Sequence, residues 1–384
     1  MKLQENKDVD KFLQKVLEQV QFKQAHEEIK TEYLNHIEES ARLGMSYGLS
    51  ANDSIADAIR RMGAPIEIGN HLNRIHVPKI DLAILISTVI LCLVGIYSLS
   101  SLGFAGSQTV WAVLGLSIAG LLMFTKPTHL IKASIYLYGL TFLLLAAAHL
   151  SGVKYLGQPY LSIGPLKLKV VDLSAVLFLI SVTGLNFRIP EKVKWRIPSI
   201  LVLSTLPLVY FVAIGSVSPG ILYFASTIAM LVSTKLSWKP LAVFMSIGLL
   251  LLSISTKGGA FLTSENYTLL QTSEAHTDFI FHHIISSFPF VALVTVLAFG
   301  LLIARSITLA REIKNQFSSA IFNAVLVMIS LGTLWGLASG LGYMPMPQTG
   351  VNLPFVSYGG SMMFAHLGLV GILLGIIRRK SLHF

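Results

Sequence analysis

Hydrophobic segments of about 20 residues recur along most of this chain, and no other feature restricts its fold so strongly. Ten such segments follow residue 80, near 81–102, 106–125, 130–150, 170–187, 197–214, 217–234, 239–255, 285–304, 317–340 and 358–377. A helix needs roughly 20 apolar residues to cross the hydrocarbon core of a bilayer. The sequence therefore predicts an all-α, polytopic membrane protein with ten transmembrane helices.

Basic residues are unevenly distributed among the connections between these segments. If the amino terminus lies inside, the inner connections carry fourteen Lys and Arg residues, and the outer ones carry only Lys154, Lys167, Lys169 and Lys257. Inner loops of membrane proteins are enriched in basic residues, so we expect both termini in the cytoplasm. The connections 151–169, 256–284 and 341–357 would then lie outside. The net charge of +10 reports this topology, and no nucleic-acid partner is expected.

The first 79 residues have a different character, because they contain 12 acidic and 11 basic side chains. Their periodicity predicts helices near 8–20, 23–47, 53–62 and 65–75, with Ser50 as a possible helix cap and Gly63 as a stop. We expect a small soluble helical domain over 1–79, followed by a membrane domain over 80–384. The stretch from Ala58 to His76 resembles the helical prefix domains of some bacterial permease-type proteins, which implies a cytoplasmic partner or self-association.

Acidic side chains are scarce after residue 79, where only seven occur, and three of them are Glu265, Glu274 and Asp278. Carboxylates are costly near a bilayer, so their clustering on a membrane protein indicates a functional site. Asp278 is followed by Phe279-Ile-Phe281, which would hold it at the membrane boundary. A carboxylate beside an apolar surface suits a general base that deprotonates a hydroxyl.

Two other interpretations of this segment remain open from the residues alone. Thr277 or Asp278 could be the cap of the helix that becomes the eighth span. His276, His282 and His283 could belong to a metal site, although their spacing matches no standard set of ligands.

The segment before the last span is rich in residues that interrupt helices. Pro345, Pro347 and Pro354 exclude a regular helix before about Ser357. Non-helical backbone at this depth is tolerated where it is buried in protein or lines a cavity. The segment could bind an anion at the start of the last helix, through Ser357, Tyr358 and the N–H groups of Gly359 and Gly360, or it could be a structural re-entrant turn.

Taken together, Glu274–Phe281 and Pro347–Ser361 resemble the SEDS family (FtsW, RodA, SpoVE), which are ten-span polymerases that build peptidoglycan strands from lipid II. The resemblance covers residues 80–384. It implies that Asp278 is the catalytic residue. It also implies a substrate-binding set made of Glu274, His276, Thr277, Pro354, Ser357, Tyr358, Gly359, Gly360, Ser361 and Asp172.

The same resemblance implies a peptidoglycan glycosyltransferase of the bacterial cell membrane that acts in division, elongation or sporulation. Its substrate would be lipid II, an undecaprenyl-linked disaccharide peptide. A divalent cation, Mg or Mn, could neutralise the leaving pyrophosphate. The expected partner is a class B penicillin-binding protein, which would contact outer loops and the lipid-facing surface of spans eight and nine.

Some positions depart from the family pattern and keep other functions open. At the start of span four the family has a glutamate followed by a lysine, whereas this chain has Asp172 and then Ala175. Ser286 and Ser287 stand where an acidic pair is expected. One alternative is a non-polymerising SEDS-like regulator or scaffold of envelope assembly. Another is a transporter of lipid-linked precursor.

Overall fold

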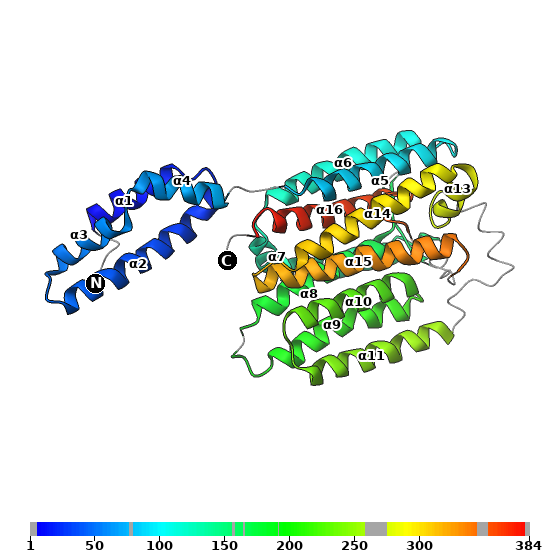
Figure 1. Ribbon diagram of the computed structural model, residues 1–384. Helices are drawn as coiled ribbons and strands as arrows, with labels where there is room; N and C mark the ends of the chain where they lie inside the picture. Colours follow the sequence, from blue (N-terminus) through cyan, green and yellow to red (C-terminus); the bar gives the residue numbers. More distant parts are fainter. Residues whose placement is uncertain are drawn as a thin grey trace. The chain divides into compact units, whose positions relative to one another are not determined.

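The computed structural model describes residues 6–76, 80–155, 158–163, 166–190, 192–257, 275–343 and 352–380. Contacts divide the chain into two compact units, which are considered separately (Figure 1). One unit contains the chain up to Ile80 and the residues from Arg378 onward. The other, called the membrane unit below, is Asp81–Ile377.

The amino-terminal unit has a short 3-10 turn, η2, and four α-helices, as its periodicity predicts. They are α1 (Lys7–Glu18), η2 (Lys23–Ala25), α2 (His26–Ser46), α3 (Ala51–Met62) and α4 (Pro65–His76). Side-chain oxygens cap α1 at Asn6 and α3 at Ser50, where each accepts hydrogen bonds from backbone N–H groups of the first turn. Gly63 ends α3 with a φ of 96°, a conformation that glycine adopts without strain. Buried side chains such as Val9, Leu13 and Val16 form the core of this unit.

The membrane unit is a bundle of helices, which confirms the predicted all-α, polytopic fold. Its helices are α5 (Leu82–Ser100), α6 (Ala105–Phe124), α7 (Thr128–Leu150), α8 (Val170–Arg188), α9 (Arg196–Ala213), α10 (Val217–Ser233), α11 (Trp238–Lys257), α13 (Ile280–Ser287), α14 (Pro289–Ala310), α15 (Gln316–Gly340) and α16 (Gly360–Ile377). Among the described residues, eight helices are long and apolar enough to cross a membrane. The apolar stretches of α10 and α11 are shorter.

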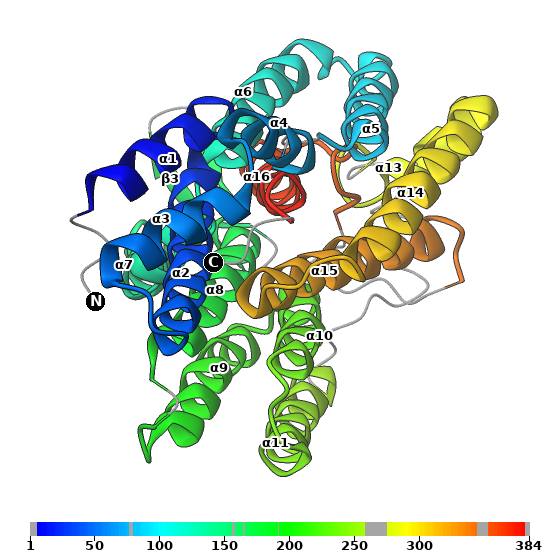
Figure 2. The same ribbon diagram turned by 60° about the vertical axis from the view of Figure 1, so that its left-hand side comes forward.

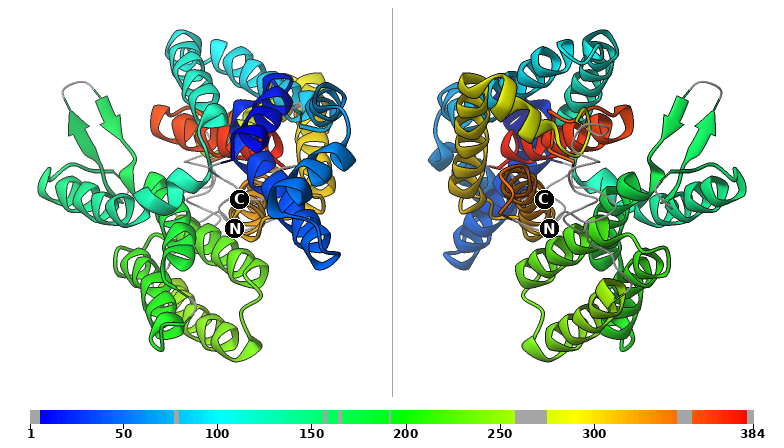
Figure 3. Two further views of the ribbon diagram at one scale, coloured as in Figure 1. Left: turned by 90° about the vertical axis from the view of Figure 1, so that its left-hand side faces the viewer. Right: turned by 90° about the vertical axis from the view of Figure 1, so that its right-hand side faces the viewer.

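Helices α8 and α16 lie at the centre of the bundle, whereas α9 to α11 form a group at one side and α5 and α6 at another (Figures 2 and 3). Of each central span 83% is buried, compared with 22% for α6 and α7. Glycines allow the close contacts: a Cβ added at Gly371 of α16 would lie 2.5 Å from the Ala119 carbonyl oxygen of α6. A Cβ added at Gly184 of α8 would lie 2.6 Å from Ser134 of α7. Small residues at such crossings let helix backbones pack directly.

The starts of two spans differ from the predicted ones. The eighth span begins at Pro289 rather than near 285, because the chain breaks at Phe288 (φ −142°, ψ 68°) after the separate short helix α13. Proline disfavours helical geometry in the residue before it and fits the first turn of the next helix. The last span begins at Gly360 rather than at 358.

The connection between α7 and α8 also contains strands that the sequence pattern did not predict. Two small antiparallel pairs form there, β1 (Lys154–Tyr155) with β2 (Gln158–Pro159) and β3 (Leu161–Ile163) with β4 (Leu166–Leu168). They bring the chain to Lys169 at the start of α8.

Candidate functional site

The turn that carries Asp278 lies at the end of the membrane unit where α8 and α16 begin, which is called the site end below. Residues 275–279 form this turn, and Ala275 to Asp278 are half-buried. The apolar triplet Phe279, Ile280 and Phe281 is buried, as predicted, and anchors the turn to the bundle. Phe281 packs on Gly340 of α15, where an added Cβ would lie 2.9 Å from the Phe281 Cβ. Apolar packing therefore fixes one side of the turn.

The structure contradicts the interpretation of Asp278 or Thr277 as a helix cap. Helix α13 begins at Ile280, and its cap position is Phe279, whose side chain makes no capping hydrogen bond. The cap position therefore lies after both Thr277 and Asp278.

Hydrogen bonds from a segment about 80 positions later in the chain hold the other side of the turn. The Tyr358 N–H donates to the His276 carbonyl oxygen at 2.8 Å. The Ser357 hydroxyl donates to the Thr277 carbonyl oxygen at 2.8 Å and accepts from the Leu353 N–H at 2.8 Å. We call these three bonds the turn clamp. Two of them end on the residues immediately before Asp278, so they fix the backbone from which its carboxylate projects, and the third holds Ser357 in place.

Backbone geometry directs Ser357 into this clamp. Phe355 is buried and has a φ of 64°, a left-handed conformation that is unusual for an aromatic residue. Such strained residues persist where surrounding contacts determine them, and they concentrate at functional sites. Gln108 of α6 supports the segment, because its side-chain amide donates to the Ser357 carbonyl oxygen at 3.3 Å. Pro354 is buried against Gly332 of α15.

Three rings form a cluster beside the clamp. The ring of His276 stacks on Phe104, with centroids 4.7 Å apart and planes 16° apart. The Tyr358 ring is 4.7 Å from Phe104 and 5.8 Å from His276. Phe104 immediately precedes α6, so the cluster joins three distant parts of the chain at the site end.

An ion pair lies at the start of α8. The Lys169 Nζ is 2.8 Å from Asp172 Oδ2, and the Asn352 side-chain amide donates to the same oxygen at 3.1 Å. The Lys169 backbone N–H donates to the Ser361 hydroxyl at 3.1 Å, which links this corner to the start of α16. Asp172 and Ser361 are both buried. Two predicted substrate-binding residues therefore take part in holding Lys169.

The pKa of Lys169 connects this ion pair with Asp278. Burial alone would lower the pKa of the ammonium group, but the negative charges of Asp172 and Asp278, and also Tyr160, outweigh burial and raise it above its usual range. Lys169 therefore stays protonated at neutral pH and is a fixed cation within electrostatic reach of both carboxylates.

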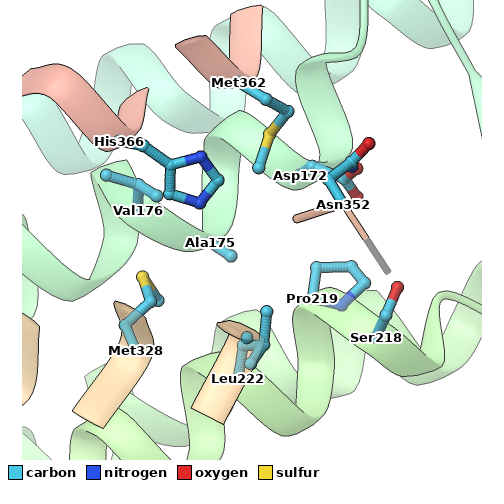
Figure 4. Close-up of a pocket in the computed structure, with 11 residues that line it drawn as sticks. Asp172, Ala175, Val176, Ser218, Pro219, Leu222, Met328, Asn352, Met362 and His366 are labelled. Carbon is cyan, nitrogen blue, oxygen red and sulfur yellow. The ribbon is translucent and has the colours of Figure 1, made fainter. Parts of the chain in front are cut away.

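A narrow cavity of about 30 Å³ extends from Asp172 into the bundle. Figure 4 shows the side chains around it, with Asp172 and Asn352 on one side and the His366 ring on another. The lining residues are Asp172, Ala175, Val176, Ser218, Pro219, Leu222, Met328, Gly332, Asn352, Met362 and His366. Ala175, where the family pattern leads one to expect a lysine, thus faces this cavity. The cation that pairs with Asp172 is Lys169, which stands six positions before Ala175.

No metal centre is formed by the residues that the structure describes, among which no group of three or more His, Cys, Asp and Glu side chains is placed to hold an ion. His283 is used otherwise: one ring nitrogen is 2.9 Å from the Ser101 hydroxyl, and the other is 3.4 Å from that of Ser287. The predicted histidine metal site is therefore not assembled in this part of the chain.

The predicted site residues come together only in part. Glu274 lies outside the described residues. His276, Thr277, Ser357, Tyr358 and Ser361 meet around the turn and the start of α8. Gly359 has a φ of 148°, and Gly360 packs on Trp111, so tightly that an added Cβ would lie 2.8 Å from the indole. Whether these residues contact substrate stays a prediction.

Two residues of the site were missed in the sequence. Lys169 is one of the four basic residues predicted on the outer side, and it stands three positions before Asp172, a spacing that pairs side chains on one helical face. That signal was available. Asn352 is 180 positions from Asp172, and no local pattern indicates their contact.

Fold and site together define a multi-span membrane protein whose polar residues gather around two carboxylates and a lysine at one end of its helices. Residues 257–382 match the sequence model of the FtsW/RodA/SpoVE family, described as cell cycle protein. A relative from Saccharophagus degradans, named probable peptidoglycan glycosyltransferase FtsW, is 25% identical in an alignment of 362 positions that covers 78% of this chain and 92% of that protein. These matches confirm that the two motifs, both of which lie within residues 257–382, resemble those of the FtsW/RodA/SpoVE family.

Solved structures agree with this fold. The crystal structure of the Thermus thermophilus Rod shape determining protein RodA is similar with a TM-score of 0.62 and 24% identity, over 78% of this chain and 97% of that one. A chain from a structure described as the structural coordination of polymerization and crosslinking by a peptidoglycan synthase complex has a TM-score of 0.63 and 24% identity, over 78% of this chain and 98% of that one.

Proposed function

We propose that this protein is a peptidoglycan glycosyltransferase that polymerises lipid II, with Asp278 as the catalytic base. The observation that supports this most is the position of Asp278. Its turn is anchored by apolar packing and by the turn clamp, and its carboxylate acts on the charge of Lys169. A reactive group held in this way is pre-organised for chemistry.

In this mechanism the Asp278 carboxylate removes the proton of an acceptor hydroxyl. The hydroxyl oxygen then bonds to the anomeric carbon of the donor sugar, while the bond from that carbon to the pyrophosphate oxygen breaks. The bonding electron pair leaves with undecaprenyl pyrophosphate. General bases of this kind contribute about 100-fold to 10,000-fold to a rate.

Lys169 has a separate task in the proposal. Since its pKa is raised, it cannot accept a proton near neutrality, and we assign it to the charge that develops on the leaving pyrophosphate. Asp172 and Ser361 hold it in place. The Ser357 hydroxyl is engaged by two backbone groups, so it positions the turn. The rings of His276 and Tyr358 remain candidates for contact with sugars.

A divalent cation, Mg or Mn, is part of the proposal only as an ion that accompanies the pyrophosphate. Asp172 is already neutralised by Lys169 at 2.8 Å, which disfavours a metal ion at that carboxylate. Asp278 is the carboxylate that would contact such an ion, and the ion would supply further positive charge to the leaving group.

We further propose that both termini are cytoplasmic and that the site end faces the outside, where lipid-linked sugars are polymerised. The distribution of basic residues supports this orientation. A class B penicillin-binding protein is the proposed partner, and the similarity to a chain of a peptidoglycan synthase complex supports it. The domain over 1–79 would bind a cytoplasmic partner or a second copy of itself, and its deletion should alter localisation in cells.

The decisive experiment uses the full-length protein in proteoliposomes with lipid II and Mg or Mn. Wild type should form polymer, and Asp278→Asn should lose at least about 100-fold of the rate. Asp57→Asn, the same chemical change in the amino-terminal unit, is the matched control and should stay active. Undiminished polymer from Asp278→Asn would overturn the assignment. Absence of polymer even with a class B penicillin-binding protein would favour a regulator, and movement of labelled lipid without polymer would favour a transporter.

A further inference from the structure

The cavity next to Asp172 has a regular construction, because four helices each contribute two residues that are four positions apart. This spacing is about one helical turn. The layer nearer the site end contains Asp172 of α8, Ser218 of α10, Gly332 of α15 and Met362 of α16. The deeper layer contains Val176, Leu222, Met328 and His366 on the same helices. The cavity is therefore one turn deep, and its floor is made of three apolar side chains and one imidazole.

His366 is an unusual residue for this floor. It lies in a membrane span and is 6% exposed. Burying a polar group without hydrogen bonds is costly, and ionisable residues inside membrane spans generally have a function. The imidazole hydrogen-bonds to the Met362 backbone and packs edge-on against Phe355, with ring centroids 5.8 Å apart. It has a second ring nitrogen, and the ring is turned toward the open centre of the cavity (Figure 4).

Asp172 presents a matching group to the same cavity. Its Oδ2 accepts from Lys169 and Asn352, whereas its Oδ1 is buried and has no hydrogen-bond partner among the described residues. A buried carboxylate oxygen without a partner is strongly disfavoured. The volume of about 30 Å³ is enough for a water molecule, and Ser218 and Asn352 add polar groups to the lining. A water needs roughly 10–15 Å³ of such space and two to four polar partners.

We propose that the cavity binds an ordered water that links His366 to Asp172 Oδ1, and that His366 is a positioning residue for the Lys169–Asp172 pair. The water satisfies Oδ1 and fixes the rotation of the carboxylate, so that Oδ2 stays directed at Lys169. Lys169 in turn stays beside Asp278. An effect of His366 on the rate of polymerisation rests on the proposed function, whereas the binding of the water does not.

The first test is independent of activity and uses a double-mutant cycle on the full-length protein in detergent. His366→Leu removes the hydrogen bond at one end of the water, and Asp172→Leu removes the hydrogen-bonding group at the other end. Thermal unfolding should show that His366→Leu lowers Tm by about 3 °C in wild type but by much less in the Asp172→Leu background. Residues joined in one hydrogen-bond network couple in this way. Equal shifts in both backgrounds would overturn the proposal.

The second test is kinetic and includes a rescue. His366→Leu should lower kcat for lipid II polymerisation about 10-fold with KM unchanged. His366→Gln, whose amide can hydrogen-bond to the water, should recover most of this loss. His129→Leu makes the same chemical change at the other end of the bundle and is the matched control. If His366→Gln is as impaired as His366→Leu, or if His366→Leu behaves like His129→Leu, the positioning assignment is wrong. If wild type forms no polymer, the proposed function fails while the thermal cycle still decides the water site.

Discussion

The two carboxylates on either side of Lys169 are held in opposite ways. Asp172 lies in the first turn of α8, is buried, and is fixed by its own neighbour in the helix and by Asn352. Asp278 lies on a half-buried turn whose backbone is fixed by a distant segment. The helix makes Asp172 a permanent counter-ion, whereas Asp278 lies half-buried on a turn at the site end. We therefore distinguish Asp172, a structural carboxylate, from Asp278, the proposed reactive one, although both interact electrostatically with Lys169.

Removal of the shared cation should have the largest effect on this comparison. Lys169→Met leaves a buried carboxylate without its counter-ion, which destabilises proteins by about 3–5 kcal/mol. Polymer formation should fall at least about 100-fold, since the charge opposite the pyrophosphate is also lost. Unfolding temperature and polymerisation rate measure the two effects. Lys154→Met, on the preceding strand β1, is the control, and a Lys169→Met protein as stable and active as wild type would contradict the model of a shared cation.

Neutralising Asp172 should be less severe than neutralising Asp278. Asp172→Asn keeps the shape of the side chain and one hydrogen-bond acceptor. Lys169 still has the negative charge of Asp278 nearby. We expect roughly a 10-fold loss of kcat, which corresponds to about 1.4 kcal/mol. Steady-state kinetics of both Asn variants, measured side by side, test this order. Equal losses would show that the two carboxylates act as one unit and would break the distinction.

Loosening the turn clamp should have an effect of similar or smaller size. Ser357→Ala removes two hydrogen bonds and leaves the Leu353 N–H unsatisfied in a buried position, at a cost of about 1–3 kcal/mol. Because Asp278 then moves relative to substrate, kcat should decrease about 10-fold with the protein still folded. Ser117→Ala is the control, since that exposed hydroxyl only bonds to its own helix. An unchanged rate for Ser357→Ala would mean that packing of Phe281 alone positions the turn.

The pH dependence should be the smallest effect near neutrality. The folded-state pKa of Lys169 is raised above its unfolded value. A raised pKa gives stabilisation that is fully present below the unfolded value, about 10.4, and that is lost as pH rises through the folded value. The difference in Tm between wild type and Lys169→Met should therefore be constant from about pH 6 to 9 and decrease only in strong alkali. A difference that disappears near neutral pH would show that Lys169 is not the fixed cation.

Much of the fold was predictable because each hydrophobic segment specifies its own helix. The break before Pro289 was missed, although proline gives a local signal for it. Asp278 stood out because acidic residues are so scarce in the membrane unit. The residues around Asp278 could not be predicted, because the turn clamp joins residues about 80 positions apart in the sequence. The bond of Asn352 to Asp172 likewise joins residues 180 positions apart. Local chemistry alone allowed Asp278 to be a helix cap, and only the observed start of α13 decided against it.

The Tyr358–His276 bond of the turn clamp joins two main-chain groups, so its formation does not depend on either side chain. Any residue except proline can occupy position 358 and still donate this bond. The backbone of the site can thus keep its shape while the side chain at this position changes. Ser357 is the exception, since its hydroxyl is required. Apart from the Ser357 hydroxyl, the turn clamp consists of backbone groups. We therefore expect the clamp to tolerate substitutions at its other positions.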